Sequence, residues 1–440
     1  MSRTLRVLVG LLFLGASALA GPGHVYDVKN YGAKGDGKTK DTQALQAAID
    51  ACAKTGGTVR LHDGVFLSGT ITLKSNMHFT IEGTATLKGT QDDADYPDTN
   101  PKSDNTQLHN CRKTLVYAER ATNLVIDGSG TIDGNGGKPE WQGSSKQRPE
   151  RTRPMAVFIV QSDQVTIQDI KMKNAAMWGI VNMETDHLTI EHIDIHSPYG
   201  GTRDGIDIVD CHHVLVENCT IYSEDDSICL KSGTARGCLD VTVRKDHVLQ
   251  STVANGLKMG TASTGGFKNV TFEDVVVEHC DKAAMAVESV DGAAIQNITF
   301  KNITIHDAGT PLFVLLGHRS GPSVGSIDSV TFDTVTADQT RHSWGSIVSG
   351  TSWQGTTYEV RNVVFRGCNL GFKGKLTEVP SDPPEYAGQY PDPNLWGAVP
   401  AAGIFFRHVH GVTLHDTTID VKGKDVRSAT VERDVTGLTK

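Results

Sequence analysis

Three aspartates between Gly201 and Gly233 have the residue type and the spacing that acid–base chemistry requires. Asp204 precedes Asp225 by a little over twenty residues, and Asp226 follows directly. If one structural repeat takes about that length, Asp204 and Asp225 lie one above the other on neighbouring repeats, with Asp226 beside them. Carboxylates gathered this closely repel one another, so the pKa of at least one of them rises. A protonated acid beside ionised bases can then protonate a leaving group and activate water.

Two kinds of site remain open for this cluster. Cleavage of a glycosidic bond needs a general acid for the leaving oxygen and a base or nucleophile on the other face of the sugar. A structural or calcium-binding acidic patch uses the same residue types. Because neighbouring residues of an extended strand point to opposite faces, Asp225 and Asp226 serve one site only if the backbone bends between them.

A repeat of short apolar strands carries these aspartates. Its units begin at Leu124, Val165, Leu188, Val214, Val241, Val270, Ile298, Val330, Val363 and Val412. From Val165 to Ile298 the starts lie 23, 26, 27, 29 and 28 residues apart. A regular period of this size indicates a solenoid.

Each unit changes parity in its middle. In the unit from Val165, the first, third, sixth and eighth residues are apolar (Val165, Ile167, Ile170 and Met172). A flat strand keeps one parity, so a corner must separate two short strands that both point inward. This pattern predicts an all-β fold, a right-handed parallel β-helix whose ten or so coils stack at about 4.8 Å. Cys219 occupies the inward sixth position of its unit and is predicted to be a core residue, like Cys368.

One helix is predicted, at the N-terminal end of the solenoid. Asp41 is placed to cap it, and Gly56-Gly57 ends it before a strand that begins at Val59. Its apolar stripe consists of Leu45, Ala48, Ile49 and Cys52.

Residues 1–20 have the features of a secretory signal peptide. Arg3 and Arg6 precede an apolar run that ends at Ala20 and is short for a membrane span. We therefore expect a secreted or periplasmic protein, with residues 21–440 forming a single β-helix domain. Loss of the two arginines changes the formal charge from −9 to −11, which disfavours nucleic acid and anionic membranes as partners. The eight cysteines are compatible with disulfides, but their pairing is not readable.

Several segments resemble glycoside hydrolase family 28, the polygalacturonases and their relatives. They are YGAKGDGKTKDT at 31–42, TRDGIDI at 202–208 and EDDSICLKSG at 224–233. The last two resemble the Asn-Thr-Asp and Asp-Asp motifs of that family. The resemblance implies inverting hydrolysis of a pectin-type polysaccharide or oligosaccharide, with Asp225 as general acid and with Asp204 and Asp226 activating water. It also implies a monomer that needs neither an organic cofactor nor a metal ion.

Two motifs depart from the family pattern. The Gly-His-Gly motif corresponds to 254–256 and contains Asn255, and the Arg-Ile-Lys motif corresponds to 286–288 and ends in Glu288. Because Glu288 would repel a uronate, either the sugar beside it is neutral and bonds Glu288 through hydroxyl groups, or another cation replaces the motif. The candidate cations are Arg203, Lys231 and Lys258, which could instead balance neighbouring acids. Substrate contacts are therefore expected at Arg203, Lys231, Asn255, Lys258 and Glu288.

Four long loops leave the repeat, at 90–110, 134–154, 339–357 and 371–401. They carry Trp141, Trp344, Trp353, Tyr386, Tyr390 and Trp396. These rings either stack on sugars or attach the loops to the solenoid. Arg407 and His408 are further residues that could reach the substrate.

Two alternatives to a hydrolase remain. A calcium-dependent pectate-type lyase would hold calcium with the aspartates and use Arg203 or Lys258 as a base, and its activity would be lost with a chelator. A β-helix that only binds carbohydrate would tolerate Asp225→Asn without loss of function. The sugar at the cleavage subsite, internal or terminal cleavage, and retention or inversion are not determined by the spacing.

Overall fold

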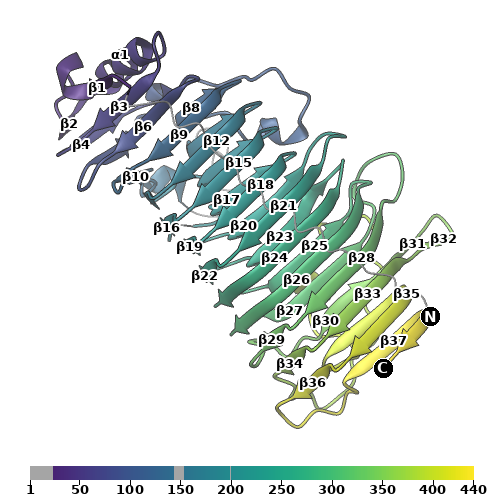
Figure 1. Cartoon of the computed structure of the whole chain (residues 1–440). Coiled ribbons are helices and arrows are strands. Elements are labelled where there is room, and N and C mark those ends of the chain that lie inside the picture. The colour runs from purple at the N-terminus through teal and green to yellow at the C-terminus, as the bar shows by residue number, and fades with distance from the viewer. Residues whose placement is uncertain (1–22, 143–152, 199) are drawn as a thin grey trace, which may run out of the picture.

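The chain winds into a single rod of stacked coils. The computed structural model describes residues 23–142, 153–198 and 200–440. Helix α1 lies at the end of the rod that β1 begins, and β37 forms the opposite end (Figure 1). Within these residues thirty-five strands form one continuous parallel sheet, so the predicted right-handed parallel β-helix is confirmed. The predicted signal peptide lies outside the described residues, among which no helix is long and apolar enough to cross a membrane.

The pairings divide the strands into three stacks, here called sheets 1, 2 and 3. Sheet 1 contains β5 (Ile71–Thr72), β8 (Thr114–Glu119), β11 (Met155–Val160), β14 (Ile180–Met183), β17 (Ile206–Val209), β20 (Ile228–Ser232), β23 (Leu257–Ser263), β25 (Ala283–Ser289), β27 (Thr310–Leu316) and β30 (Ser346–Ser349). Sheet 2 contains β1 (Val25–Asp27), β3 (Gly57–Leu61), β6 (Met77–Ile81), β9 (Thr122–Asp127), β12 (Asp163–Gln168), β15 (Asp186–Glu191), β18 (His212–Glu217), β21 (Cys238–Arg244), β28 (Ser326–Asp333) and β33 (Val360–Arg366).

Sheet 3 and the strands that bridge two sheets complete the coils. Sheet 3 contains β2 (Asp36–Lys40), β4 (Val65–Ser68), β7 (Thr86–Gly89), β10 (Thr131–Asp133), β13 (Lys171–Lys173), β16 (Asp194–His196), β19 (Thr220–Ser223), β22 (His247–Ser251), β29 (Thr336–Ala337), β34 (Asn369–Phe372) and β36 (Thr418–Val421). The strands that pair in two sheets are β24 (Phe267–Glu278), β26 (Ala294–His306), β35 (Ile404–His415) and β37 (Thr430–Thr439). Outside the coils lie the antiparallel pair β31 (Thr351–Trp353) and β32 (Thr356–Tyr358), the short helix α2 (Pro393–Trp396) and the 3-10 turns at Val28–Tyr31, Asp93–Asp95, Thr106–His109 and Pro139–Trp141.

The predicted corner between two inward-facing strands is a single residue in the left-handed conformation. In the unit from Val165 it is Asp169, with φ 56°, and the residue that follows points into the core. The same fifth position has a positive φ in His192, Asn218, Lys245, Asp274, Asn302, Thr334, Gly367 and Asp416. One such residue reverses the parity of the strand, which explains why the apolar pattern shifts at every corner.

Stacked side chains fill the inside of the rod. Four phenylalanines from consecutive coils, Phe272, Phe300, Phe332 and Phe365, lie with neighbouring ring centroids 4.9, 5.3 and 4.9 Å apart. Cys219 and Cys368 belong to the same buried core, as predicted. All eight cysteines lie in the described ranges and are buried free thiols. The disulfides that their number allowed are therefore not formed.

Helix α1 spans Thr42–Cys52 and buries the predicted apolar stripe. Asp41 stands at its N-terminal end, but the prediction that its side chain caps the helix is wrong. Its carboxylate instead accepts hydrogen bonds from the backbone N–H of Lys34 (2.7 Å) and Gly35 (2.9 Å) and so fixes the preceding loop. Strand β3 begins at Gly57, two residues earlier than predicted.

Loops cover the outer face of sheet 1 at two places. Near β8, β11 and β14 they enclose an apolar cluster that includes Phe158 and Val181. Near β25, β27 and β30 the loop 371–401 encloses a second cluster, where the buried Trp396 packs edge-on against Phe313 with centroids 5.5 Å apart. Trp141 is also fully buried, so Trp141 and Trp396 attach their loops to the rod. Strands β17, β20 and β23 lie between β14 and β25 in the stack, and all of their residues are buried.

Candidate active site

The three predicted aspartates meet where two consecutive coils enter sheet 1. Ile206 of β17 pairs with Ile228 of β20, and this register places Asp204 level with Asp226. The prediction that Asp225 lies above Asp204 is therefore wrong by one residue; the backbone N–H of Asp225 instead bonds to the carbonyl of Arg203, at 3.3 Å. The three carboxylates remain close enough to interact electrostatically.

Asp226 is buried and held in its ionised form. Its Oδ1 accepts hydrogen bonds from the backbone N–H (3.1 Å) and side-chain amide (2.8 Å) of Asn255. Its Oδ2 forms an ion pair with Lys258, at 3.0 Å. Burial raises the pKa of Asp226, but the charges of Lys258 and Lys231 and these hydrogen bonds outweigh burial and lower the pKa to about 2. The sequence predicts that Asn255 binds substrate. Its side chain instead holds Asp226, a candidate catalytic residue, in position.

Asp204 belongs to a second buried group, which includes a carboxylate that the sequence reasoning missed. Lys231 donates to Asp204 Oδ2 at 2.6 Å and also to Asp207 Oδ1. Burial raises the pKa of both aspartates, against the opposing charge of Lys231. Asp207 stands between the inward-facing Ile206 and Ile208, so alternation along β17 would have assigned it to the outer face.

Asp225 is the least buried of the three predicted catalytic residues. Its Oδ2 accepts a hydrogen bond from the backbone N–H of Thr202 (2.8 Å), and its Oδ1 accepts one from the backbone N–H of Asp226 (3.0 Å). The backbone turns before β20, as is required if Asp225 and Asp226 are to serve one site. The two adjacent side chains therefore lie in different environments. Asp226 is enclosed among cations and amides, whereas Asp225 is partly exposed.

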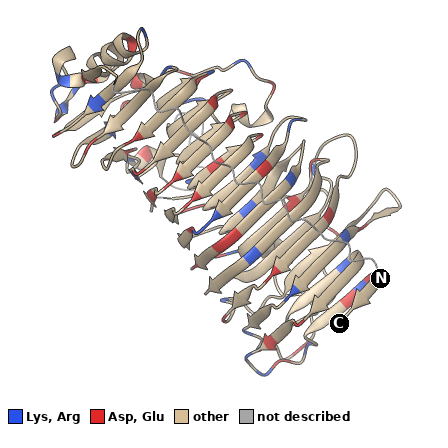
Figure 2. Cartoon of the chain, in the orientation of Figure 1, with Lys and Arg blue, Asp and Glu red and all other residues tan. Residues whose placement is uncertain are grey.

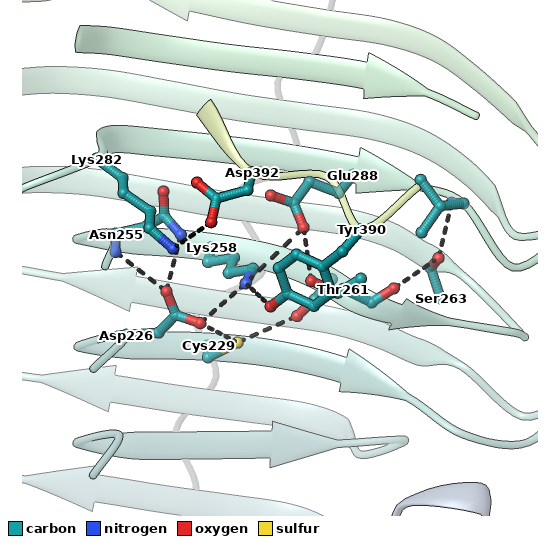
Figure 3. Close-up of polar contacts among 12 residues, drawn as sticks. Asp226, Cys229, Asn255, Lys258, Thr261, Ser263, Lys282, Glu288, Tyr390 and Asp392 are labelled. Atoms are coloured by element: carbon teal, nitrogen blue, oxygen red, sulfur yellow. Dashed lines mark hydrogen bonds and ion pairs between the residues drawn. The ribbon is translucent and has the colours of Figure 1, made fainter. Parts of the chain in front are cut away.

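Lys258 connects Asp226 to the carboxyl group of Glu288 on β25. Figure 3 shows Lys258 between these two acids, with Tyr390 reaching it from the loop 371–401. Its Nζ lies 3.8 Å from Glu288 Oε2 and 3.5 Å from the Tyr390 hydroxyl. Thr261 donates to Glu288 Oε2 at 3.0 Å. Burial raises the pKa of Glu288 to about 7, although Lys258 opposes the change.

Arg203 is not placed for substrate. It is fully buried, and its guanidinium donates to the carbonyl oxygens of Ala175 (2.8 Å), Gly136 (3.3 Å), Trp141 (3.2 Å) and Gly200. It thus ties the loop that contains Trp141 to the coil that carries Asp204. The expected substrate contact at Arg203 is at odds with this position.

The other predicted cations each bridge two acids. Lys231 lies between Asp204 and Asp207, with its Nζ 4.6 Å from the centroid of the Trp178 ring, and Lys258 lies between Asp226 and Glu288. Both signs of charge occur together on the middle coils (Figure 2). The interpretation that these lysines balance neighbouring acids fits the structure better than direct pairing with a substrate carboxylate.

Asp204, Asp207 and Cys229 bring donor atoms within 4.8 Å of one another, the spacing of a metal site. Calcium prefers six to eight oxygen ligands, and one of these three donors is a thiol. The Lys231 ammonium already compensates the two carboxylates. The donor set therefore does not fit the calcium ion that a lyase would use.

Tyr390 contacts Lys258, whereas the other loop and C-terminal candidates have different partners among the described residues. Trp344 stacks on His342, with centroids 4.0 Å apart, and Trp353 packs near His318, with centroids 4.8 Å apart. Arg407 is buried and donates to Ser349 and to Pro383, and His408 bonds to Glu385 and Asp434. These contacts attach loops to the C-terminal coils.

Comparison with known proteins identifies relatives of the whole coil stack. The profile described as "Glycosyl hydrolases family 28" matches residues 53–379. A probable polygalacturonase from Vitis vinifera is 24% identical over 384 residues, covering 83% of this chain and 73% of that protein. An exo-poly-alpha-D-galacturonosidase from Dickeya chrysanthemi is 25% identical, covering 67% of this chain and 65% of its own.

Solved structures share the fold. An exopolygalacturonase from Thermotoga maritima superposes with a TM-score of 0.68 at 22% identity, covering 80% of this chain and 88% of its own. The family 28 exopolygalacturonase from Yersinia enterocolitica gives a TM-score of 0.70 at 18% identity, covering 94% and 78%. At these identities the likeness establishes the β-helix architecture.

Proposed function

Because this chain belongs to glycosyl hydrolases family 28 and is thus a glycosidase, we propose that it hydrolyses glycosidic bonds of pectin-type polysaccharide or oligosaccharide with inversion. The observation that carries the proposal is that neighbouring carboxylates meet at the start of two consecutive coils in different environments. Asp226 is enclosed by Lys258 and Asn255 and is ionised, with a pKa of about 2, whereas the adjacent Asp225 is more exposed and accepts hydrogen bonds from the backbone N–H groups of Thr202 and Asp226. Acid and base at one bond require carboxylates whose environments differ in this way.

Each aspartate receives one role. Asp226 is the base that accepts a proton from water, because its pKa of about 2 keeps it ionised near neutral pH. Asp204 lies level with it on the neighbouring coil and positions the same water. Asp225, the most accessible of the three, protonates the leaving oxygen. Water attack opposite the leaving group inverts the anomeric carbon.

The test is a panel assay of the purified protein on polygalacturonate, rhamnogalacturonan and neutral pectic oligosaccharides, with and without chelator. We expect chelator-resistant release of saturated products. Asp225→Asn is expected to lower turnover at least about a hundredfold while the melting temperature stays near that of the wild type. Unsaturated products that disappear with chelator would indicate a lyase instead, and binding without cleavage would indicate a carbohydrate-binding protein.

We also propose that the protein is exported and acts as a monomer. The signal-like residues 1–20 and the pectin-type substrate, which lies outside cells, support export. N-terminal sequencing of the exported protein is expected to begin at Gly21, and light scattering is expected to give the mass of one chain. A retained N-terminus or a dimer mass would contradict these proposals.

A further inference from the structure

We propose that the sugar ring bound over Lys258, Glu288 and Tyr390 is uncharged rather than a uronate, and that Tyr390 is a specificity-determining residue that selects it. This inference rests on the proposed cleavage of a pectin-type chain and names the sugar at one position of that chain. Four features of the described residues carry it: the pairing of the cations, the surplus of carboxyl groups, the unpartnered oxygen of Glu288 and the fixed ring of Tyr390.

Four cations around this position are each paired with acids of the protein. Lys258 contacts Asp226 and Glu288, and Lys231 contacts Asp204 and Asp207. Farther along the face, Lys282 pairs with Asp392 at 2.9 Å, and Arg319 pairs with Asp291 at 2.6 Å. Within the described part of the chain, recognition of a uronate would therefore require one of these pairs to break.

Carboxyl groups outnumber cations here. The four cations stand among seven carboxyl groups, namely Asp204, Asp207, Asp225, Asp226, Glu288, Asp291 and Asp392. Burial raises the pKa of Asp204, Asp207 and Glu288, so the repulsion that a further carboxylate from the substrate would add is greatest above pH 7, where Glu288 is ionised, in a region where water is largely excluded and screening is weak. A sugar with only hydroxyl groups meets no such repulsion.

Glu288 has an unused hydrogen-bonding atom. The side chain is fully buried, Thr261 and Lys258 engage its Oε2, and its Oε1 has no hydrogen-bond partner among the described residues. A buried carboxyl oxygen without a partner is unfavourable, so a hydroxyl donor would stabilise this position. When Glu288 is ionised, above its pKa of about 7, a second carboxylate offers no proton for this oxygen.

Tyr390 supplies the surface that a sugar ring would contact. Its side chain is half-exposed while its hydroxyl lies 3.5 Å from Lys258. The segment that carries it is fixed on both sides: Asp392 pairs with Lys282, and Trp396 packs edge-on with Tyr386, with centroids 4.9 Å apart. A fixed aromatic face matches the C–H groups of a neutral sugar. Figure 3 shows this ring beside Lys258, Thr261 and Glu288.

The experiment compares kcat/KM on an oligogalacturonate and on a rhamnogalacturonan oligosaccharide of equal length. We expect wild-type protein to prefer the latter at least about tenfold. At pH 8, above the pKa of about 7 of the buried Glu288, Glu288→Gln removes one negative charge at nearly constant shape and is expected to reduce that preference several-fold. The matched control is Glu273→Gln, which removes a carboxylate on the distant β24 and is expected to leave the preference unchanged.

A second measurement separates binding from turnover. In the Asp225→Asn background, calorimetry is expected to show tighter binding of the rhamnogalacturonan oligosaccharide, with Tyr390→Ala weakening it about tenfold and Tyr390→Phe weakening it much less. Faster cleavage of oligogalacturonate by the wild type, or unchanged affinity in Tyr390→Ala, would overturn the inference and leave the glycosidase assignment intact. Failure to cleave either substrate would instead overturn the proposed function on which it rests.

Discussion

Two buried aspartates in different regions of the rod have pKa values that are shifted in opposite directions from the ordinary value of an aspartate. Asp226, on the outer face of sheet 1, is 4% exposed and has a pKa lowered to about 2. Asp246, at the corner between sheets 2 and 3, is 2% exposed, and burial raises its pKa to about 7. The exposed fractions are nearly equal, so burial alone does not determine the protonation state.

The difference lies in the partners of each carboxylate. Asp226 has the Lys258 ammonium and two N–H groups of Asn255. Asp246 occupies the inward sixth position of its repeat, where it accepts the backbone N–H of Cys219 at 2.6 Å, and its Oδ2 has no hydrogen-bond partner among the described residues. A buried acid is therefore usable as a base only where the outer face supplies a cation.

The largest expected effect is loss of activity when Asp226 is neutralised. Asp226→Asn should lower kcat by about two to four orders of magnitude, because the variant cannot accept a proton from water. Initial rates of reducing-sugar release measure this change. Asp246→Asn is the matched control and should retain the wild-type rate; near-wild-type turnover in Asp226→Asn would contradict the assignment.

Removal of the cation should make Asp226 resemble Asp246. Lys258→Met leaves Asp226 buried without its ion pair and should lower the free energy of unfolding by about 3 kcal/mol at pH 7. The folded pKa of Asp226 lies below its ordinary value, so its stabilising effect is present above about pH 4 and is lost as the pH falls towards 2. Urea unfolding from pH 2 to 7 should show a smaller loss of stability on the acid side in Lys258→Met than in the wild type.

Asp246→Asn should stabilise the fold at high pH. The folded pKa of Asp246 lies above its ordinary value, so the wild-type residue lowers stability as the pH rises from about 4, with the full cost present above about pH 7. We expect Asp246→Asn to raise the free energy of unfolding by about 2 kcal/mol at pH 8 and by much less at pH 4. The exposed Asp194→Asn is the control; an equal gain at both pH values would rule out titration of Asp246 as the cause.

The smallest expected effect concerns the thiols beside these two aspartates. Cys219 and Cys229 are buried, unpaired and raised in pKa by burial. Reductant should therefore change the melting temperature by less than about 1 °C, and a thiol reagent should modify all eight cysteines only after unfolding. Rapid modification of the native protein would show that the thiol at Cys229 or Cys219 is accessible.

Local patterns predicted the repeat but not its register. The parity change at each corner required one unusual backbone conformation, which Asp169 and its equivalents adopt. The spacing of the aspartates placed Asp225 above Asp204, whereas strand pairing puts Asp226 there. When the repeat length varies from coil to coil, the spacing of residues along the sequence does not reveal which residues pair between neighbouring strands.

The sequence by itself determined the β-helix, its N-terminal helix and the gathering of Asp204, Asp225 and Asp226, because strand alternation and repeat length are properties of neighbouring residues. Only the tertiary structure determined which carboxyl groups each lysine pairs with. Lys258 meets Asp226 and Glu288 only because three coils stack in one register, and it meets Tyr390 across 132 residues because a loop folds back over them. Protonation states and subsite chemistry depend on these distant contacts, since the charges that surround a group set its pKa.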